Sequence, residues 1–66
     1  MKIGEIIKDL REEKELGVKE LAKELDVSFK TIYRWENGAK EPQASNIIKL
    51  ADFFGVTADY ILGREK

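Results

Sequence analysis

Hydrophobic residues recur at helical spacing along the chain, in stretches separated by polar breaks and glycines. The first stretch predicts an amphipathic helix over residues 2–14, with an apolar face formed by Ile3, Ile6, Ile7 and Leu10. Gly17 either ends this stretch or opens the next one. The second stretch predicts a short helix that begins at about Val18, with an apolar face formed by Leu21, Ala22 and Leu25.

A three-residue break, Asp26-Val27-Ser28, follows the second predicted helix. Asp tolerates the left-handed backbone conformation better than most residues, and Ser28 is a favourable N-cap for a third helix over residues 29–37. Two helices joined by such a short break are typical of a helix-turn-helix, and Ala22 is small enough to let the second of these helices approach closely.

The rest of the chain predicts two more helices. Asn37-Gly38 is expected to close the third helix as a left-handed C-cap, and a polar loop with Pro42 follows. The fourth helix ends at Gly55 and has a core face formed by Ala44, Ile47, Leu50, Ala51 and Phe54. Thr57 is expected to cap a fifth helix over residues 58–62, which Gly63 ends. Five helices and no strand candidate predict an all-α fold.

Length and composition narrow the class of function. A chain of 66 residues is expected to form one domain, residues 1–66, with no separate domain for a small-molecule ligand. The sequence holds neither Cys nor His, and therefore lacks the usual zinc ligands and the usual general base. We expect no metal, no cofactor and no enzymatic activity. No apolar run is long enough for a signal peptide or a membrane span, which predicts a cytoplasmic protein without a membrane partner.

The charges are unevenly distributed. The net charge is −1, but residues 27–49 carry four basic and two acidic residues and form the only net positive part of the chain. A local basic patch matters more for phosphate affinity than the total charge does. The middle of the chain is therefore the candidate nucleic-acid surface.

The sequence resembles the phage-repressor and Cro-like (XRE-type) helix-turn-helix family over nearly its whole length. The resemblance is carried by Glu20-Leu21-Ala22, Val27-Ser28, the block from Ile32 to Gly38, Pro42, Leu50-Ala51, Gly55-Val56-Thr57 and Leu62-Gly63. It implies a compact five-helix lambda-repressor-like domain, with the helix-turn-helix in helices 2 and 3. It also implies a sequence-specific DNA-binding transcriptional regulator, a repressor on a palindromic operator. Two positions depart from the family: Gly17-Val18 replaces a frequent Ser/Thr-Gln pair, and Asp26 replaces a frequent Gly.

The third helix divides into a core face and an opposite face. At about 100° per residue, Ile32 and Trp35 point to the core, which makes Trp35 structural rather than a stacking partner for DNA. The residues on or beside the opposite face are Phe29, Lys30, Tyr33 and Arg34. Arg and Lys suit guanine, and an aromatic group suits the thymine methyl. The resemblance places base contacts at the same four residues, although Phe29 could instead be a core aromatic.

Other contacts are expected around the third helix. Phosphate contacts, which fix register, are expected at its ends and in the next loop, from Ser28, Asn37, the Gly38 amide and Lys40. The resemblance implies a partly buried structural ion pair between Arg11 and Glu36. The alternative is an exposed Glu36 without a partner.

One recognition helix reads too few base pairs for regulation, which predicts a homodimer on two half-sites. Candidate dimer residues on the fourth and fifth helices are Ile48, Phe53, Tyr60 and Ile61. The alternative is that these side chains complete the core of the domain. A second functional hypothesis is a protein-interaction module, such as an antitoxin or adaptor, with weak DNA binding. It is favoured by the net charge of −1 and by Val18, which stands where the family frequently has Gln.

Overall fold

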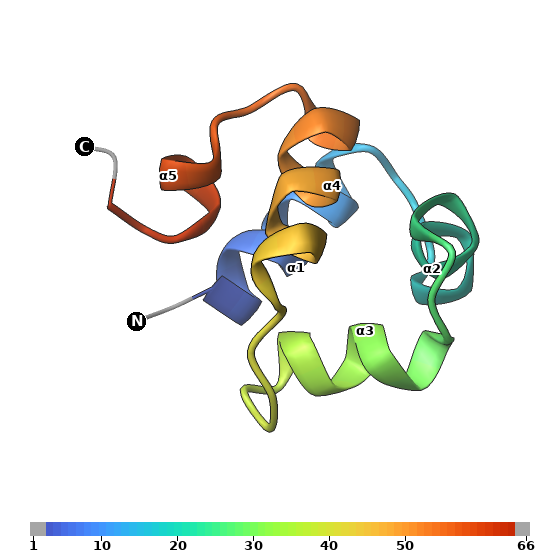
Figure 1. The fold of residues 1–66 in the computed structure, drawn as a ribbon. Coiled ribbons are helices and arrows are strands. Elements are labelled where there is room, and N and C mark those ends of the chain that lie inside the picture. Colours follow the sequence, from blue (N-terminus) through green and yellow to red (C-terminus); the bar gives the residue numbers. More distant parts are fainter. Residues whose placement is uncertain (1–2, 65–66) are drawn as a thin grey trace.

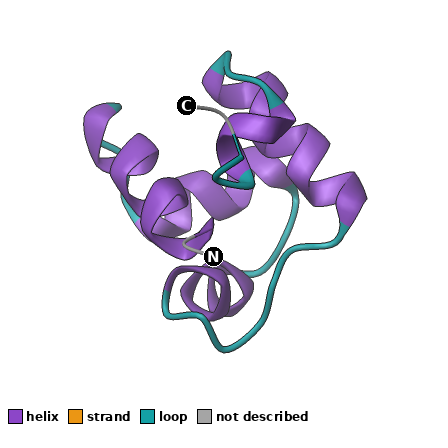
Figure 2. Cartoon of the chain, turned by 90° about the vertical axis from the view of Figure 1, so that its left-hand side faces the viewer, coloured by secondary structure: helices purple, strands orange, loops and turns teal. Residues whose placement is uncertain are grey.

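A computed structural model describes residues 3–64 of the chain, and within that range every regular element is an α-helix (Figures 1 and 2). The elements are α1 (Ile3–Glu13), α2 (Val18–Leu25), α3 (Phe29–Glu36), α4 (Ala44–Phe54) and α5 (Ala58–Ile61). The predicted all-α class and the five helices are confirmed. Lys2, where we expected the first helix to begin, lies outside the described residues.

The first helix ends at Glu13, one residue before its predicted end. Glu15 takes a left-handed conformation with φ 57°, and the Leu16 N–H donates to the Arg11 carbonyl at 3.1 Å. This arrangement closes a helix and is usually built with Gly. Gly17 then opens α2, and its N–H donates to Glu20 Oε1 at 2.7 Å. The sequence had left open whether Gly17 ends one helix or begins the next.

The helix-turn-helix is formed by α2, α3 and the turn between them. Asp26 ends α2 in the left-handed region with φ 58°, and the Val27 N–H donates to the Ala22 carbonyl at 3.0 Å. Ser28 caps α3, because its Oγ accepts the Thr31 N–H at 3.2 Å. Both local predictions for this turn are confirmed, and together they set the direction in which α3 leaves α2.

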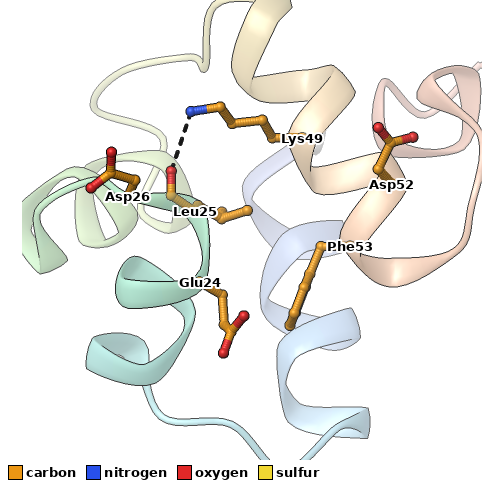
Figure 3. Close-up of a pocket in the computed structure, with 6 residues that line it drawn as sticks. All are labelled: Glu24, Leu25, Asp26, Lys49, Asp52 and Phe53. Carbon is orange, nitrogen blue, oxygen red and sulfur yellow. Dashed lines mark hydrogen bonds between the residues drawn. The ribbon is translucent and has the colours of Figure 1, made fainter.

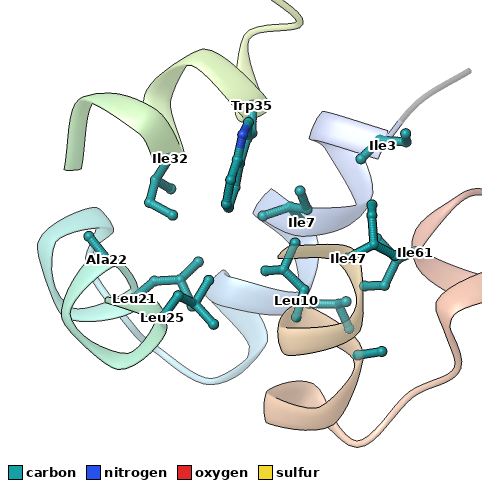
Figure 4. Packing of buried hydrophobic residues seen from close by; sticks show 12 residues of the cluster. Ile3, Ile7, Leu10, Leu21, Ala22, Leu25, Ile32, Trp35, Ile47 and Ile61 are labelled. Atoms are coloured by element: carbon teal, nitrogen blue, oxygen red, sulfur yellow. The ribbon is translucent and has the colours of Figure 1, made fainter. Parts of the chain in front are cut away.

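One apolar core joins the five helices. From α3, Ile32 and Trp35 point into it towards side chains of α1 and α2 (Figure 4). Trp35 is only 2% exposed, in agreement with its predicted structural role. No polar or charged side chain among residues 3–64 is fully buried. The buried set is Ile3, Ile7, Leu10, Leu21, Ala22, Leu25, Ile32, Trp35, Ile47, Leu50, Ala51 and Ile61.

Two sequence predictions on α4 and α5 are wrong. Ile61, a candidate dimer residue, has no exposed surface and belongs to the core with Ile47. The short α5 packs against α1 and α4, and this packing buries the Ile61 side chain where a second copy of the chain cannot reach it. Ala44 was assigned to the core face of α4 but is exposed, because it is the first residue of that helix.

Candidate nucleic-acid interface

The outer face of α3 is a mixed aromatic and basic surface. Phe29 is 39% exposed and Tyr33 is 55% exposed, and Lys30 and Arg34 are exposed beside them. Phe29 is therefore not a core residue, which was the alternative interpretation. Neither Lys30 nor Arg34 forms an ion pair within residues 3–64. The four side chains predicted to read bases are thus all accessible on the helix opposite to its buried face.

The aromatic side chains of this face are organised. The Phe29 and Tyr33 rings meet edge to face, with centroids 6.3 Å apart and planes at 72°. From α2, the Lys19 ammonium lies 5.2 Å from the centroid of the Phe29 ring. These residues border a hollow of about 370 Å³ between the first turns of the two helices, lined by Gly17, Val18, Lys19, Glu20, Phe29 and Tyr33.

Lys19 is a residue that the sequence interpretation missed. In the sequence it is one exposed charge among several on α2. Only the crossing of the two helices shows that it reaches α3 next to Phe29. A possible signal was its position in the first turn of the second helix, because the first turns of both helices of a helix-turn-helix lie near the DNA.

The residues predicted to contact phosphate differ in how many of their polar atoms are already used in internal hydrogen bonds. Lys40 is exposed and forms no ion pair within the described part of the chain. The Ser28 Oγ lies 3.0 Å from Thr31 Oγ1, so the Ser28 hydroxyl can donate outwards when Thr31 donates to it. Asn37 Oδ1 accepts the Ala39 N–H at 2.9 Å, which leaves the amide nitrogen of Asn37 to act as donor.

The Gly38 amide does not fit its predicted role. Gly38 has φ 82°, as expected for a left-handed helix end, but its N–H donates to the Trp35 carbonyl at 3.3 Å. The last turn of α3 therefore uses this donor, and it is not free for a phosphate. Sequence spacing correctly placed Gly38 at the helix end and did not show where its N–H points.

A side chain of α1 fixes the C-terminal end of α3. Arg11 Nε donates to Glu36 Oε2 at 2.8 Å and Arg11 Nη2 to Glu36 Oε1 at 3.0 Å, while Arg11 Nη1 donates to the Leu16 carbonyl at 2.8 Å. The two side chains are 12% and 9% exposed. The hydrogen bonds that Arg11 donates to the Glu36 carboxylate raise the pKa of the Arg11 guanidinium above its ordinary value, against the opposing effect of burial. Glu36 is therefore neutralised by Arg11 rather than left facing phosphates unpaired.

A second surface hollow, of about 500 Å³, lies between the end of α2 and α4 and involves no residue of α3 (Figure 3). Here Lys49 Nζ donates to the Leu25 carbonyl at 3.4 Å, which ties α4 to the C-terminal end of α2. The other lining residues are Glu24, Asp26, Asp52 and Phe53. The lining of this hollow therefore carries three acidic residues and one basic residue.

The remaining candidate dimer residues differ in how far their side chains are exposed. Ile48 on α4 is 58% exposed and Tyr60 on α5 is 41% exposed. Phe53 is partly buried against the core, stacks edge to face on Phe54 with ring centroids 5.0 Å apart, and has the Lys14 ammonium 5.7 Å from its ring. Ile48 and Tyr60 are therefore the accessible apolar side chains of this group.

Neither a metal site nor a membrane-spanning helix is found within residues 3–64. No cluster of three or more His, Cys, Asp or Glu side chains is arranged to hold a metal ion. Within the same range, each helix is too short or too polar to cross a bilayer.

Proteins with a similar sequence or fold are helix-turn-helix proteins and repressors. The profile of the helix-turn-helix family matches residues 7–61. The chain is 26% identical over 66 residues to the HTH-type transcriptional regulator ImmR of Bacillus subtilis, covering all of this chain and 52% of ImmR. It is 35% identical over 66 residues to the HTH-type transcriptional activator BcrR of Enterococcus faecalis, covering 32% of BcrR. The chain thus spans about half or less of the length of these relatives.

A solved structure matches nearly every residue. The P22 c2 repressor protein, crystallised in complex with a synthetic operator, superimposes with a TM-score of 0.90 and 28% sequence identity, covering 98% of this chain and 98% of that protein chain. The predicted lambda-repressor-like fold is confirmed, with the helix-turn-helix in α2 and α3.

Proposed function

The chain belongs to the helix-turn-helix family, and we propose that it is a sequence-specific DNA-binding transcriptional regulator, a repressor that binds a palindromic operator as a homodimer. α3 is the recognition helix, and it enters the major groove with its first turns against the base edges. The observation that carries the proposal is the accessible face of α3, where two cations and two aromatic rings point away from the core. A resemblance to a repressor solved with its operator supports it.

The residues of this face match the chemistry of base edges. Arg34 and Lys30 supply donors for guanine O6 and N7, which is the commonest specific contact in the major groove. Tyr33 supplies an apolar ring with a hydroxyl that can donate or accept, and Phe29 supplies an apolar ring alone. Arg34 and Lys30 have no ion-pair partner within residues 3–64, so they can contact a base without first breaking an ion pair inside the protein.

Phosphate contacts from both ends of α3 hold the helix in register. Ser28 lies at its N-terminal end, while Asn37 and Lys40 follow its C-terminal end. Contacts of this kind orient the protein on the duplex without reading sequence. The Arg11–Glu36 pair contributes indirectly, because it removes the repulsion that an unpaired Glu36 would exert on the DNA backbone.

The size of the domain favours a dimer. The described residues measure 29 × 23 × 20 Å, whereas successive turns of the major groove on one face of DNA are roughly 34 Å apart. One copy therefore cannot read two half-sites. Ile48 and Tyr60 are the apolar side chains that we propose for the contact between copies, with Phe53 at its edge and Ile61 excluded by its burial.

Selection from a random double-stranded DNA library tests the proposal directly. We expect enrichment of a palindrome whose half-sites are centred about one helical turn apart, and affinity that falls steeply with salt. A reporter gene with the selected site in its promoter then gives the direction of regulation, and we expect lower expression. Absence of any enriched sequence, together with weak binding at low salt, would instead favour a protein-interaction module.

A further inference from the structure

We propose that Phe29 and Tyr33 form a seat for the 5-methyl group of a pyrimidine in the major groove, with Lys19 from α2 as the residue that positions the Phe29 ring. The seat rests on the DNA binding proposed above and specifies what chemical group one part of the interface reads. Thymine and 5-methylcytosine both carry this group at the same place.

The geometry of the two rings carries the proposal. Their planes stand at 72° to each other with centroids 6.3 Å apart, so they form two walls of an apolar corner. Both rings keep exposed surface, 39% for Phe29 and 55% for Tyr33, and they border the hollow between α2 and α3. An apolar group that enters this corner loses its contact with water on two sides, which is the condition under which a methyl group adds affinity.

The chemistry of Phe29 restricts what it can read. Its side chain has no donor or acceptor, so it cannot distinguish bases by hydrogen bonding. In an intact duplex the faces of the bases are covered by stacking, and only their edges are accessible in the groove. The one apolar group on those edges in the major groove is the methyl at C5 of the pyrimidine. Phe29 on the first turn of the recognition helix therefore matches this group better than any other.

Lys19 gives the corner a fixed position. Its ammonium lies 5.2 Å from the centroid of the Phe29 ring, within the range of a cation–π contact. The adjacent Glu20 carboxylate accepts the Gly17 N–H and caps α2, and Lys19 forms no ion pair within residues 3–64. A contact from α2 thus restrains an exposed ring of α3, and Lys19 acts through Phe29 rather than on the base itself.

The test uses base analogues within the site obtained by library selection. In one arm each thymine is replaced singly by deoxyuridine, which removes only the methyl group. In the other arm the sensitive T·A pair is replaced by C·G, with and without a 5-methyl group on the cytosine. Loss of one methyl contact should weaken binding about fourfold at one thymine of each half-site. An effect in the thymine arm alone assigns the seat to thymine, and an effect in both arms assigns it to any 5-methylpyrimidine.

Variants of the protein then connect the methyl effect to the proposed residues. In Phe29→Ala the affinity ratio between thymine and deoxyuridine should fall to about one, whereas Phe29→Leu should keep part of it. Lys19→Met should lower the ratio, while Lys23→Met, the matched loss of a charge on α2, should leave it unchanged. Because the ratio compares two DNAs with one protein, general loss of affinity cancels, and circular dichroism verifies the fold of each variant.

The outcomes separate this proposal from the function on which it rests. If the protein binds its selected site and no methyl group changes affinity more than twofold, the seat is refuted and the regulator remains. If Phe29→Ala keeps the full methyl effect, the seat lies elsewhere and the proposal is wrong. A full effect in Lys19→Met would refute the positioning role. Failure to select any DNA overturns the function and the seat together.

Discussion

Arg11 Nε and Glu36 Oε2 lie 2.8 Å apart, although the two residues are 25 positions apart in the sequence. The same guanidinium donates to Glu36 Oε1 and to the Leu16 carbonyl, so one side chain of α1 joins the end of α3 and the loop that precedes α2. A planar guanidinium with several donors suits this role, and Lys could not reproduce it. The recognition helix is thereby held at its C-terminal end by a side chain of α1, a helix that supplies none of the residues proposed above to contact DNA.

The first prediction is that this pair is energetically coupled. Either Arg11→Met or Glu36→Gln should lower the free energy of unfolding by about 3 kcal/mol, because each leaves a mostly buried partner without its counter-charge. Trp35, the single tryptophan, is buried and provides the fluorescence signal for denaturant unfolding. The double variant should lose less than the sum of the single losses. Strictly additive losses would mean that the contact does not contribute to stability.

The second prediction concerns Gly4, where α1 approaches the last turn of α3. A Cβ at this position would lie 2.6 Å from the Glu36 carbonyl oxygen and closer still to that of Trp35. We expect Gly4→Ala to lower the free energy of unfolding by about 1–3 kcal/mol, although Ala is the better helix former. Asp9→Ala, on an exposed position of the same helix, serves as the control and should change stability by less than about 0.5 kcal/mol. A stabilised Gly4→Ala variant would contradict the close approach.

The third prediction separates base readers from phosphate ligands. Lys30→Ala and Arg34→Ala should each weaken specific binding by about 1–3 kcal/mol and relax the preference at particular base pairs. Lys40→Ala should weaken binding to all sequences alike and reduce the slope of log affinity against log salt by about one. Titrations of selected and scrambled DNA at several salt concentrations distinguish the two patterns. A uniform loss for Lys30→Ala or Arg34→Ala would reassign that residue to the phosphate backbone.

The fourth prediction concerns the turn of the helix-turn-helix. Because Asp26 has φ 58°, Asp26→Ala should destabilise the fold by about 1 kcal/mol, whereas Asp26→Gly should be close to neutral. Asp26→Asn tolerates the same backbone and removes the charge, so it separates conformation from electrostatics. Thermal melts of the three variants give the comparison. Equal losses for Ala and Gly would show that the carboxylate matters and the backbone conformation does not.

The fifth prediction is that exposed apolar residues of α4 and α5 join two copies on DNA. Ile48→Ser and Tyr60→Ser should leave the fold intact, because neither side chain belongs to the buried core, and should weaken binding to a palindrome more than binding to an isolated half-site. Asp52→Ser on α4 is the polar control. Sedimentation of the complexes should give two protein chains per palindrome. One chain per palindromic site at saturation would refute the dimer.

The sequence by itself determined the local structure of this protein. Helical periodicity and the cap residues Ser28 and Thr57 act over three or four neighbouring positions, so they need no partner from elsewhere in the chain. The same periodicity separated the buried Trp35 from the exposed Tyr33 on α3, because a helix fixes which side chains share a face. The five helices and the exposed face of α3 could therefore be predicted from local sequence patterns alone.

The tertiary structure decided whatever depends on two segments meeting. Ile61 is apolar in the sequence whether it faces the core or a partner, and only the packing of α5 buries it. Lys19 gains its place beside Phe29 from the crossing of α2 and α3, and the Gly38 N–H is taken by a carbonyl of the last helical turn. Gly4 shows the same limit. The backbone of α1 approaches that of α3 at this residue only in the assembled fold, and the hydrophobic pattern of neither helix indicates it.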